Sequence, residues 1–124
     1  MARLVKPDEY AARRGEILGA ALELMHDKGY ERMTIDDVLA KTQMSKGALY
    51  HYFRSKRAML DGIVEMMGES GTRALQAIVA DPELGAIDKL HAYFAASSAW
   101  KAANLTAVST AMRLWRDENN ALLR

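Results

Sequence analysis

The chain has 124 residues, of which half are hydrophobic and 27% are charged, a globular composition that argues against intrinsic disorder. Its 17 Lys and Arg nearly balance its 16 Asp and Glu, so net charge indicates no polyanionic partner, and the absence of cysteine excludes disulfides, thiolate metal sites and a cysteine nucleophile. No apolar run approaches the roughly 20 residues that cross a bilayer, and the first ten residues are too polar for a secretory signal, so we expect a soluble cytoplasmic protein.

The first expected element is a helix over residues 9–27. Strong helix formers dominate the chain and alternating β-branched runs are missing, which predicts an all-α fold. Apolar residues recur in this segment at three- and four-residue spacing, at Ile17, Leu18, Ala21, Leu22 and Met25. Gly29 is free to adopt the left-handed conformation that ends a helix, and we expect Tyr30 and Met33 to pack back on the helix.

Two short helices are expected next. Thr34 and Asp37 have the spacing of a capping box, which predicts a helix that begins at Thr34 and ends near Lys41. Ser45 is the next start signal and predicts a helix of about nine residues that reaches Phe53. The two helices are separated by a tight turn, so they form a helix-turn-helix.

The second of these short helices has two distinct faces. With Leu49 set toward the core, a rotation of about 100° per residue places Phe53 on the core face, while Gly47 and His51 point outward. An outward glycine weakens a short helix without any packing reason. Close approach of a large body to the helix backbone explains it, as when a helix enters the major groove of DNA.

A longer helix and several further helices fill the rest of the chain. Ser55 begins a fourth helix, which Gly68 and Gly71 weaken, so it is expected to bend there or to end and restart. Beyond it we expect a new start with Asp81 as the N-cap and Pro82 at the first position, helices near residues 86–101 and 105–116, and a last helix from about Asp117.

Charge is unevenly distributed along the chain. Residues 1–57 hold 11 basic and 8 acidic side chains, whereas residues 58–124 hold 6 and 8. Residues 41–57 contain no acid, and their basic residues are Lys41, Lys46, Arg54, Lys56 and Arg57. Basic groups interleaved with the aromatic residues at positions 50–53 are typical of surfaces that bind phosphate backbones, although a merely solvated helical surface has the same composition.

The segment from Thr34, TIDDVLAKTQMSKGALYHYFRSKRAML, strongly resembles the DNA-binding domain of the TetR family of bacterial transcriptional regulators. Its most specific part is SKGALYHYF followed by SK, and the resemblance covers about residues 10–60. The later helices resemble, more weakly, the start of that family's ligand-binding and dimerisation domain. The resemblance implies a helix-turn-helix DNA-binding domain over residues 1–55 and a partial C-terminal domain over residues 56–124.

The resemblance also implies which residues contact DNA. They are Thr34, Ser45, Lys46, Gly47, Ala48, Tyr50, His51, Tyr52 and Lys56. The hydroxyls of Thr34 and Ser45 would cap helices as well as bind phosphate, Lys46 would reach a base edge or a phosphate, and Lys56 would add a phosphate contact. Tyr52 is as much expected to pack as to bind phosphate. From the first helix, Arg13 or Arg14 would clamp the DNA backbone.

Two departures from the family pattern stand out. The turn at residues 42–44 lacks the usual glycine, so Gln43 is expected to need a positive φ, at a cost on the order of 1 kcal/mol. Family members also continue past residue 124 with two helices that build the dimer, so the chain is a fragment, dimerises differently or is a non-functional remnant. Five large apolar residues of the second half are expected mostly in the core, some of them lining a partial effector pocket: Tyr93, Phe94, Trp100, Met112 and Trp115.

Enzyme motifs are absent from the sequence. It has no H-E-x-x-H, Walker loop, nucleotide-binding glycine pattern or G-x-S-x-G, and His26, His51 and His91 lie far apart, so we expect no enzyme activity, metal or cofactor. The expected function is a TetR-type repressor, a homodimer that binds double-stranded operator DNA and is released by a small molecule. The alternative is an interaction module that pairs with itself or a longer relative, which salt dependence distinguishes from DNA binding.

Overall fold

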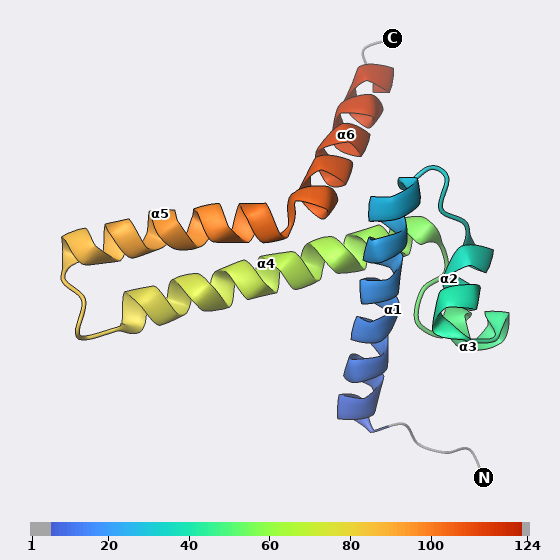
Figure 1. Cartoon of the computed structure of the whole chain (residues 1–124), viewed down its shortest axis with the longest axis horizontal. Helices are drawn as coiled ribbons and strands as arrows, with labels where there is room; N and C mark the ends of the chain where they lie inside the picture. Colours follow the sequence, from blue (N-terminus) through green and yellow to red (C-terminus); the bar gives the residue numbers. More distant parts are fainter. Residues whose placement is uncertain (1–5, 123–124) are drawn as a thin grey trace. The chain divides into compact units, whose positions relative to one another are not determined.

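The computed structural model describes residues 6–122, and for residues 119–122 it describes the backbone only. The described residues contain helices and no strand, which confirms the all-α prediction (Figure 1). The helices are α1 (Pro7–Lys28), α2 (Ile35–Thr42), α3 (Lys46–Tyr50), α4 (Lys56–Ala80), α5 (Ala86–Ala103) and α6 (Leu105–Leu122).

The chain forms two compact units that meet between Ile63 and Val64, inside α4. The boundary between the expected domains, at residues 55–56, stays a prediction. Residues 1–5 of the expected first domain and residues 123–124 of the second lie outside the described residues.

The first unit has a continuous apolar core. It is built from α1, the turn after it, α2, α3 and the first two turns of α4, with buried side chains at Ile17, Leu18, Ala21, Met25, Tyr30, Met33, Val38, Leu49, Phe53, Met59, Leu60 and Ile63. Gly29 ends α1 with φ 85°, and its N–H donates to the Met25 carbonyl. Removal of this apolar surface from water is the main term that holds α1, α2 and α3 together.

Two expected helix boundaries differ in this half of the chain. Regular helix α3 covers five residues rather than about nine, although a further turn continues to Phe53 through the bonds from Tyr52 N–H and Phe53 N–H to the Leu49 carbonyl. Helix α4 runs without interruption through Gly68 and Gly71. A cost of about 1 kcal/mol for each glycine does not break a 25-residue helix in which Ala, Leu, Met, Glu, Gln, Lys and Arg, all good helix formers, make up more than half of the residues.

The expected helix start at Asp81 and Pro82 is wrong. The Asp81 carboxylate accepts from the Glu83 N–H at 2.9 Å and forms a local turn, while α5 begins at Ala86 with Gly85 as its N-cap. Aspartate favours such turns because its side chain binds backbone groups two residues on. The expected break near Asp117 is also wrong, since α6 continues through it to Leu122.

The second unit is a helical hairpin followed by α6. The later part of α4 and α5 run antiparallel side by side, joined at residues 81–85 (Figure 1). The Trp100 indole N–H donates to the Met67 carbonyl at 3.2 Å, and the Lys89 ammonium donates to the Val79 carbonyl at 2.7 Å. No described helix is long and apolar enough to cross a membrane.

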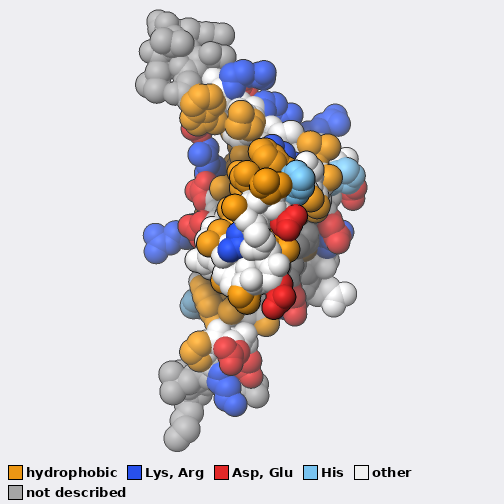
Figure 2. Space-filling view, turned by 90° about the vertical axis from the view of Figure 1, so that its left-hand side faces the viewer, with side chains coloured by type: hydrophobic (Ala, Val, Ile, Leu, Met, Phe, Trp, Pro, Cys, Tyr) orange, Lys and Arg blue, Asp and Glu red, His pale blue; other side chains and the backbone are white. Residues whose placement is uncertain are grey.

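The second unit leaves much apolar surface in water. Helix α5 has no fully buried residue, and hydrophobic side chains are visible at the surface when the end that joins α4 to α5 faces the viewer (Figure 2). The expectation that most of the large apolar residues here are core is wrong, because Tyr93, Phe94, Met112 and Trp115 are exposed and Trp100 is half-buried. Exposed patches of this kind mark interaction surfaces.

Candidate nucleic-acid interface

The start of α2 is fixed by a reciprocal cap. The Thr34 side chain accepts from the Asp37 N–H at 3.1 Å, and the Asp37 carboxylate accepts from the Thr34 N–H at 3.0 Å. The bond from the Thr34 N–H, helped by the Lys28 ammonium at 3.0 Å, holds the pKa of Asp37 below its ordinary value. The capping box predicted from the sequence is confirmed.

The turn between α2 and α3 is closed without glycine. Gln43 ends α2 with φ 56° and ψ 32°, the left-handed conformation expected for it, and is the one residue other than glycine with positive φ among those described. The Thr42 hydroxyl donates to the Val38 carbonyl at 2.7 Å and holds the last turn of α2. The helix-turn-helix therefore forms with the strained residue in place.

Helix α3 presents the predicted outer face. Its N-cap is Ser45, whose hydroxyl accepts from the Ala48 N–H at 3.2 Å. Leu49 is fully buried and Phe53 is 4% exposed, so they anchor α3 as expected. Gly47, Tyr50 and His51 are exposed and Ala48 is half-buried, and a Cβ added at Gly47 would meet no atom within 4 Å.

The basic side chains of residues 41–57 differ in what they contact. Lys41 pairs with Glu23 at 2.9 Å, which raises the Lys41 pKa and lowers the Glu23 pKa, and Arg57 pairs with Asp61 at 3.3 Å. The Lys46 ammonium lies 5.9 Å from the centre of the Tyr50 ring. Among the described residues, no acid pairs with Lys46 or Arg54. Positive charge without an acidic partner among the described residues therefore lies at the start of α3, at Lys46, and just beyond its last turn, at Arg54.

Lys56, expected at a phosphate, lies elsewhere in the structure. Its ammonium donates to three main-chain carbonyls, those of Tyr30 at 2.9 Å, Glu31 at 3.0 Å and Met33 at 3.3 Å. It also lies 4.7 Å from the centre of the Tyr30 ring. Since a lysine ammonium has three donors, these contacts use all of them within the protein.

Tyr52 packs on α1. Its ring stacks on that of Tyr10 with centroids 4.8 Å apart and an interplanar angle of 20°, so this half-buried side chain has a packing contact, one of its two expected roles. The Arg14 guanidinium lies 5.2 Å from the centre of the Phe53 ring, and Arg13 pairs with Glu16 at 2.6 Å. Both arginines that the sequence offered as DNA clamps thus have contacts inside the protein.

Two residues of this surface were not singled out from the sequence. Arg54 was counted in the basic stretch, and its position directly after Phe53, the last residue of the expected second short helix, was the available signal. Tyr10, on α1, stacks on Tyr52. The two residues are about forty positions apart in the sequence, so no local pattern indicates that they pair. Within residues 6–122, no group of three His, Asp or Glu side chains is placed to hold a metal ion.

Comparisons with known proteins agree with this geometry. The family model described as "Bacterial regulatory proteins, tetR family" matches residues 17–63, from the core of α1 to the second turn of α4. The chain is similar to the tetracycline repressor protein class G of Vibrio anguillarum, with 35% identity over 63 residues, 50% of this chain and 30% of that protein. It is also similar to the uncharacterized HTH-type transcriptional regulator YvdT of Bacillus subtilis, with 34% identity over 59 residues, 48% of this chain and 30% of that protein.

The match to the transcriptional regulator AcuR of Cereibacter sphaeroides is longer, with 29% identity over 87 residues, 70% of this chain and 39% of that protein. The chain therefore spans about a third of the length of the curated relatives that it matches. No solved structure matches it significantly.

Proposed function

Because this chain belongs to the TetR family of bacterial regulatory proteins, we propose that it is a cytoplasmic transcriptional repressor that binds double-stranded operator DNA through α3. The observation that carries the proposal is the outer face of α3, where Lys46 has no acidic partner among the described residues and Gly47 opens the backbone to close approach. Three matched relatives, the tetracycline repressor protein among them, are named repressors, which supports this direction of regulation.

In the proposed complex, α3 enters the major groove. Lys46 reaches a base edge or a phosphate. Because Gly47 and Ala48 are small, the base edges at the bottom of the groove can approach the helix backbone, and Ala48 offers a methyl contact. Tyr50 donates its hydroxyl to a phosphate, and His51 meets a base edge or a phosphate.

Backbone contacts flank that helix. The exposed hydroxyls of Thr34 and Ser45 contact phosphates beside the helix starts that they cap, and Arg54 adds a positive charge. Tyr52 positions α3 through its stack on Tyr10, with its hydroxyl as a further phosphate donor. For Lys56 we propose a positioning role in place of a phosphate contact, because its three donors already bind carbonyls.

A homodimer completes the proposed mechanism. Two copies place two α3 helices in successive major grooves, about 34–36 Å apart on a near-palindromic operator. The exposed apolar residues of the second unit support self-association. A small molecule bound to the second unit shifts the population toward a state with the wrong spacing, and the repressor leaves the DNA.

The test is operator binding by matched variants. Operator fragments are selected from random duplexes with the wild-type chain, and affinity is then measured by fluorescence anisotropy across a salt series. Lys46→Ala should weaken binding at least about tenfold and lower the slope of log K against log salt by about 1. Tyr50→Phe should weaken binding about fivefold, the loss of one hydrogen bond. Arg113→Ala, which removes an exposed cation from α6, serves as the charge control.

Unchanged affinity in both α3 variants, with melting temperatures equal to that of the wild type, would refute the assignment of the DNA-binding face. Light scattering on the same samples gives the mass of the bound species. A chain that self-associates but shows no salt-dependent DNA binding would instead be an interaction module.

A further inference from the structure

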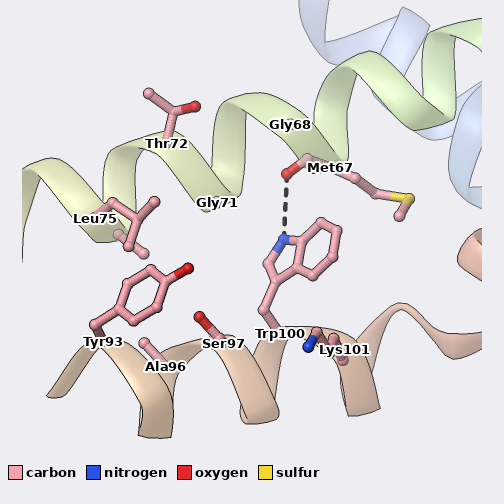
Figure 3. Close-up of a pocket in the computed structure, with 11 residues that line it drawn as sticks. Met67, Gly68, Gly71, Thr72, Leu75, Tyr93, Ala96, Ser97, Trp100 and Lys101 are labelled. Atoms are coloured by element: carbon pink, nitrogen blue, oxygen red, sulfur yellow. Dashed lines mark hydrogen bonds between the residues drawn. The ribbon is translucent and has the colours of Figure 1, made fainter. Parts of the chain in front are cut away.

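A cavity of about 320 Å³ lies between α4 and α5, within the second unit (Figure 3). From α4 it is lined by Met67, Gly68, Gly71, Thr72, Ala74 and Leu75, and α5 contributes Tyr93, Ala96, Ser97, Trp100 and Lys101. Tyr93 and Trp100 are two of the five residues from which a partial effector pocket was expected, and the family comparisons leave the chemistry of its ligand open. Its size is at the lower end for small-molecule sites, which suits a ligand of one or two fused rings.

Two aromatic rings bound the cavity along α5. Tyr93, Ser97 and Trp100 lie three to four positions apart, so all three share the helix face that meets α4 (Figure 3). The rings of Tyr93 and Trp100 project toward α4, and their positions on the helix are about 10 Å apart. The hydrogen bond from the Trp100 indole N–H to the Met67 carbonyl holds the Trp100 ring in place.

The wall that α4 contributes includes two glycines and so has little side-chain relief. Gly71 faces Trp100 so closely that an added Cβ would lie 3.4 Å from the indole nitrogen, and Gly68 has no side chain either. Leu75 closes this wall opposite Tyr93 (Figure 3). The space between the two aromatic rings of α5 and the glycine-containing face of α4 is narrow, so it admits a flat molecule better than a bulky one.

The cavity lining carries positive charge and no negative charge. Lys101, which follows Trp100 on α5, is the only charged residue in the cavity lining (Figure 3). Within the described part of the chain, no carboxylate pairs with Lys101. Thr72, Ser97 and Tyr93 add hydroxyl groups that can donate to an oxygen anion.

We propose that this cavity binds a small planar aromatic molecule that carries an anionic group, with its ring between Tyr93 and Trp100 and its anion at Lys101. Aromatic pairing supplies the preference for a flat ring, and a charge-assisted hydrogen bond supplies the preference for the anion. The inference names the chemistry of the effector in the repressor mechanism and so rests on the proposed function for its regulatory meaning, whereas the binding site itself stands on the geometry of α4 and α5.

The test uses 2-naphthoate as the probe, on the full chain in a Trp115→Phe background. The indole ¹H–¹⁵N signal then reports on Trp100 alone, beside the cavity. We expect a saturable shift of this signal with 2-naphthoate. The uncharged 2-naphthamide should bind about tenfold more weakly, the loss expected for a charge-assisted contact, and cyclohexanecarboxylate, an anion without a flat ring, should cause no saturable shift at the same concentrations.

Three variants localise the binding. Lys101→Gln should weaken 2-naphthoate about tenfold and leave 2-naphthamide within twofold, while the matched charge control Arg113→Gln should change neither. Ser97→Leu, which fills this space and favours the helix, should abolish binding of both.

The proposal is overturned if 2-naphthoate gives no saturable shift, if the amide binds as tightly, or if Ser97→Leu leaves binding intact. Since these titrations contain no DNA, their failure would leave operator binding by α3 untouched. Conversely, failure of operator binding would leave this site standing.

Discussion

The ammonium of Lys56 lies over the ring of Tyr30, 4.7 Å from its centre, and donates to the main-chain carbonyl of the same residue at 2.9 Å. Two further bonds, to the carbonyls of Glu31 and Met33, complete the contact. Lys56 is the first residue of α4, and Tyr30 and Met33 are buried in the turn between α1 and α2. One side chain therefore joins the start of the long helix to the segment from which the helix-turn-helix begins.

Removal of this contact should change DNA affinity without changing the number of phosphates bound. We expect Lys56→Met to weaken operator binding several-fold, because the turn at residues 30–33 loses the cation that organises its carbonyls. The slope of log K against log salt should stay within about 0.3 of the wild-type value, since a lost phosphate contact lowers it by about 0.9. Lys46→Ala is the matched comparison, and a slope lowered by about 0.9 in Lys56→Met would assign Lys56 to the phosphate backbone instead.

The stack of Tyr52 on Tyr10 should be measurable as a pairwise coupling. In a double-mutant cycle of Tyr10→Ala and Tyr52→Ala, we expect a coupling free energy of about 0.5–1.5 kcal/mol from urea unfolding. Tyr52→Phe keeps the ring, so it should retain most of the stability and test the hydroxyl alone in DNA binding. Strictly additive alanine effects would show that the two rings do not stabilise each other.

Gly62 and Gly19 should respond differently to alanine. A Cβ at Gly62 would lie 3.1 Å from Phe53 Cε1 and 3.2 Å from Leu18 Cδ2, whereas a Cβ at Gly19 would meet nothing within 4 Å. Gly19→Ala should gain about 0.5–1 kcal/mol from helix propensity. Because overpacking of a tight core costs about 1–3 kcal/mol, Gly62→Ala should be at least about 1 kcal/mol less stable than Gly19→Ala in chemical unfolding. Equal stabilisation of the two variants would show that α1 and α4 separate freely at this point.

The capping box should make stability depend on pH in the acid range. Its hydrogen bonds lower the pKa of Asp37 in the folded chain, so the carboxylate stabilises the fold above its unfolded pKa and loses that contribution as pH falls through the lower folded pKa. We expect the stability advantage of the wild type over Asp37→Asn to be full at pH 7 and to shrink steadily below pH about 4. Urea unfolding of both proteins between pH 2.5 and 7 measures this difference, and an advantage independent of pH would contradict it.

The sequence by itself determined the local elements of the first unit. Caps at Thr34 and Ser45, the positive φ of Gln43 and the inward positions of Leu49 and Phe53 follow from hydrogen-bonding groups and helical periodicity within a few residues. The same local reasoning placed a helix start at Asp81 and Pro82 and was wrong there, because an aspartate that caps a helix equally closes a turn.

Only the tertiary structure decided the contacts between segments far apart in the chain. The stack of Tyr10 on Tyr52, the carbonyls that bind Lys56 and the cavity beside Trp100 each join residues more than twenty positions apart. Periodicity gives the direction in which a side chain leaves its own helix, but the partner it meets depends on how helices pack against one another. For this reason the outward and inward sides of α3 could be predicted from the printed residues, whereas the contacts of Lys56 and Tyr52 and the lining of the cavity depend on the packing of the helices.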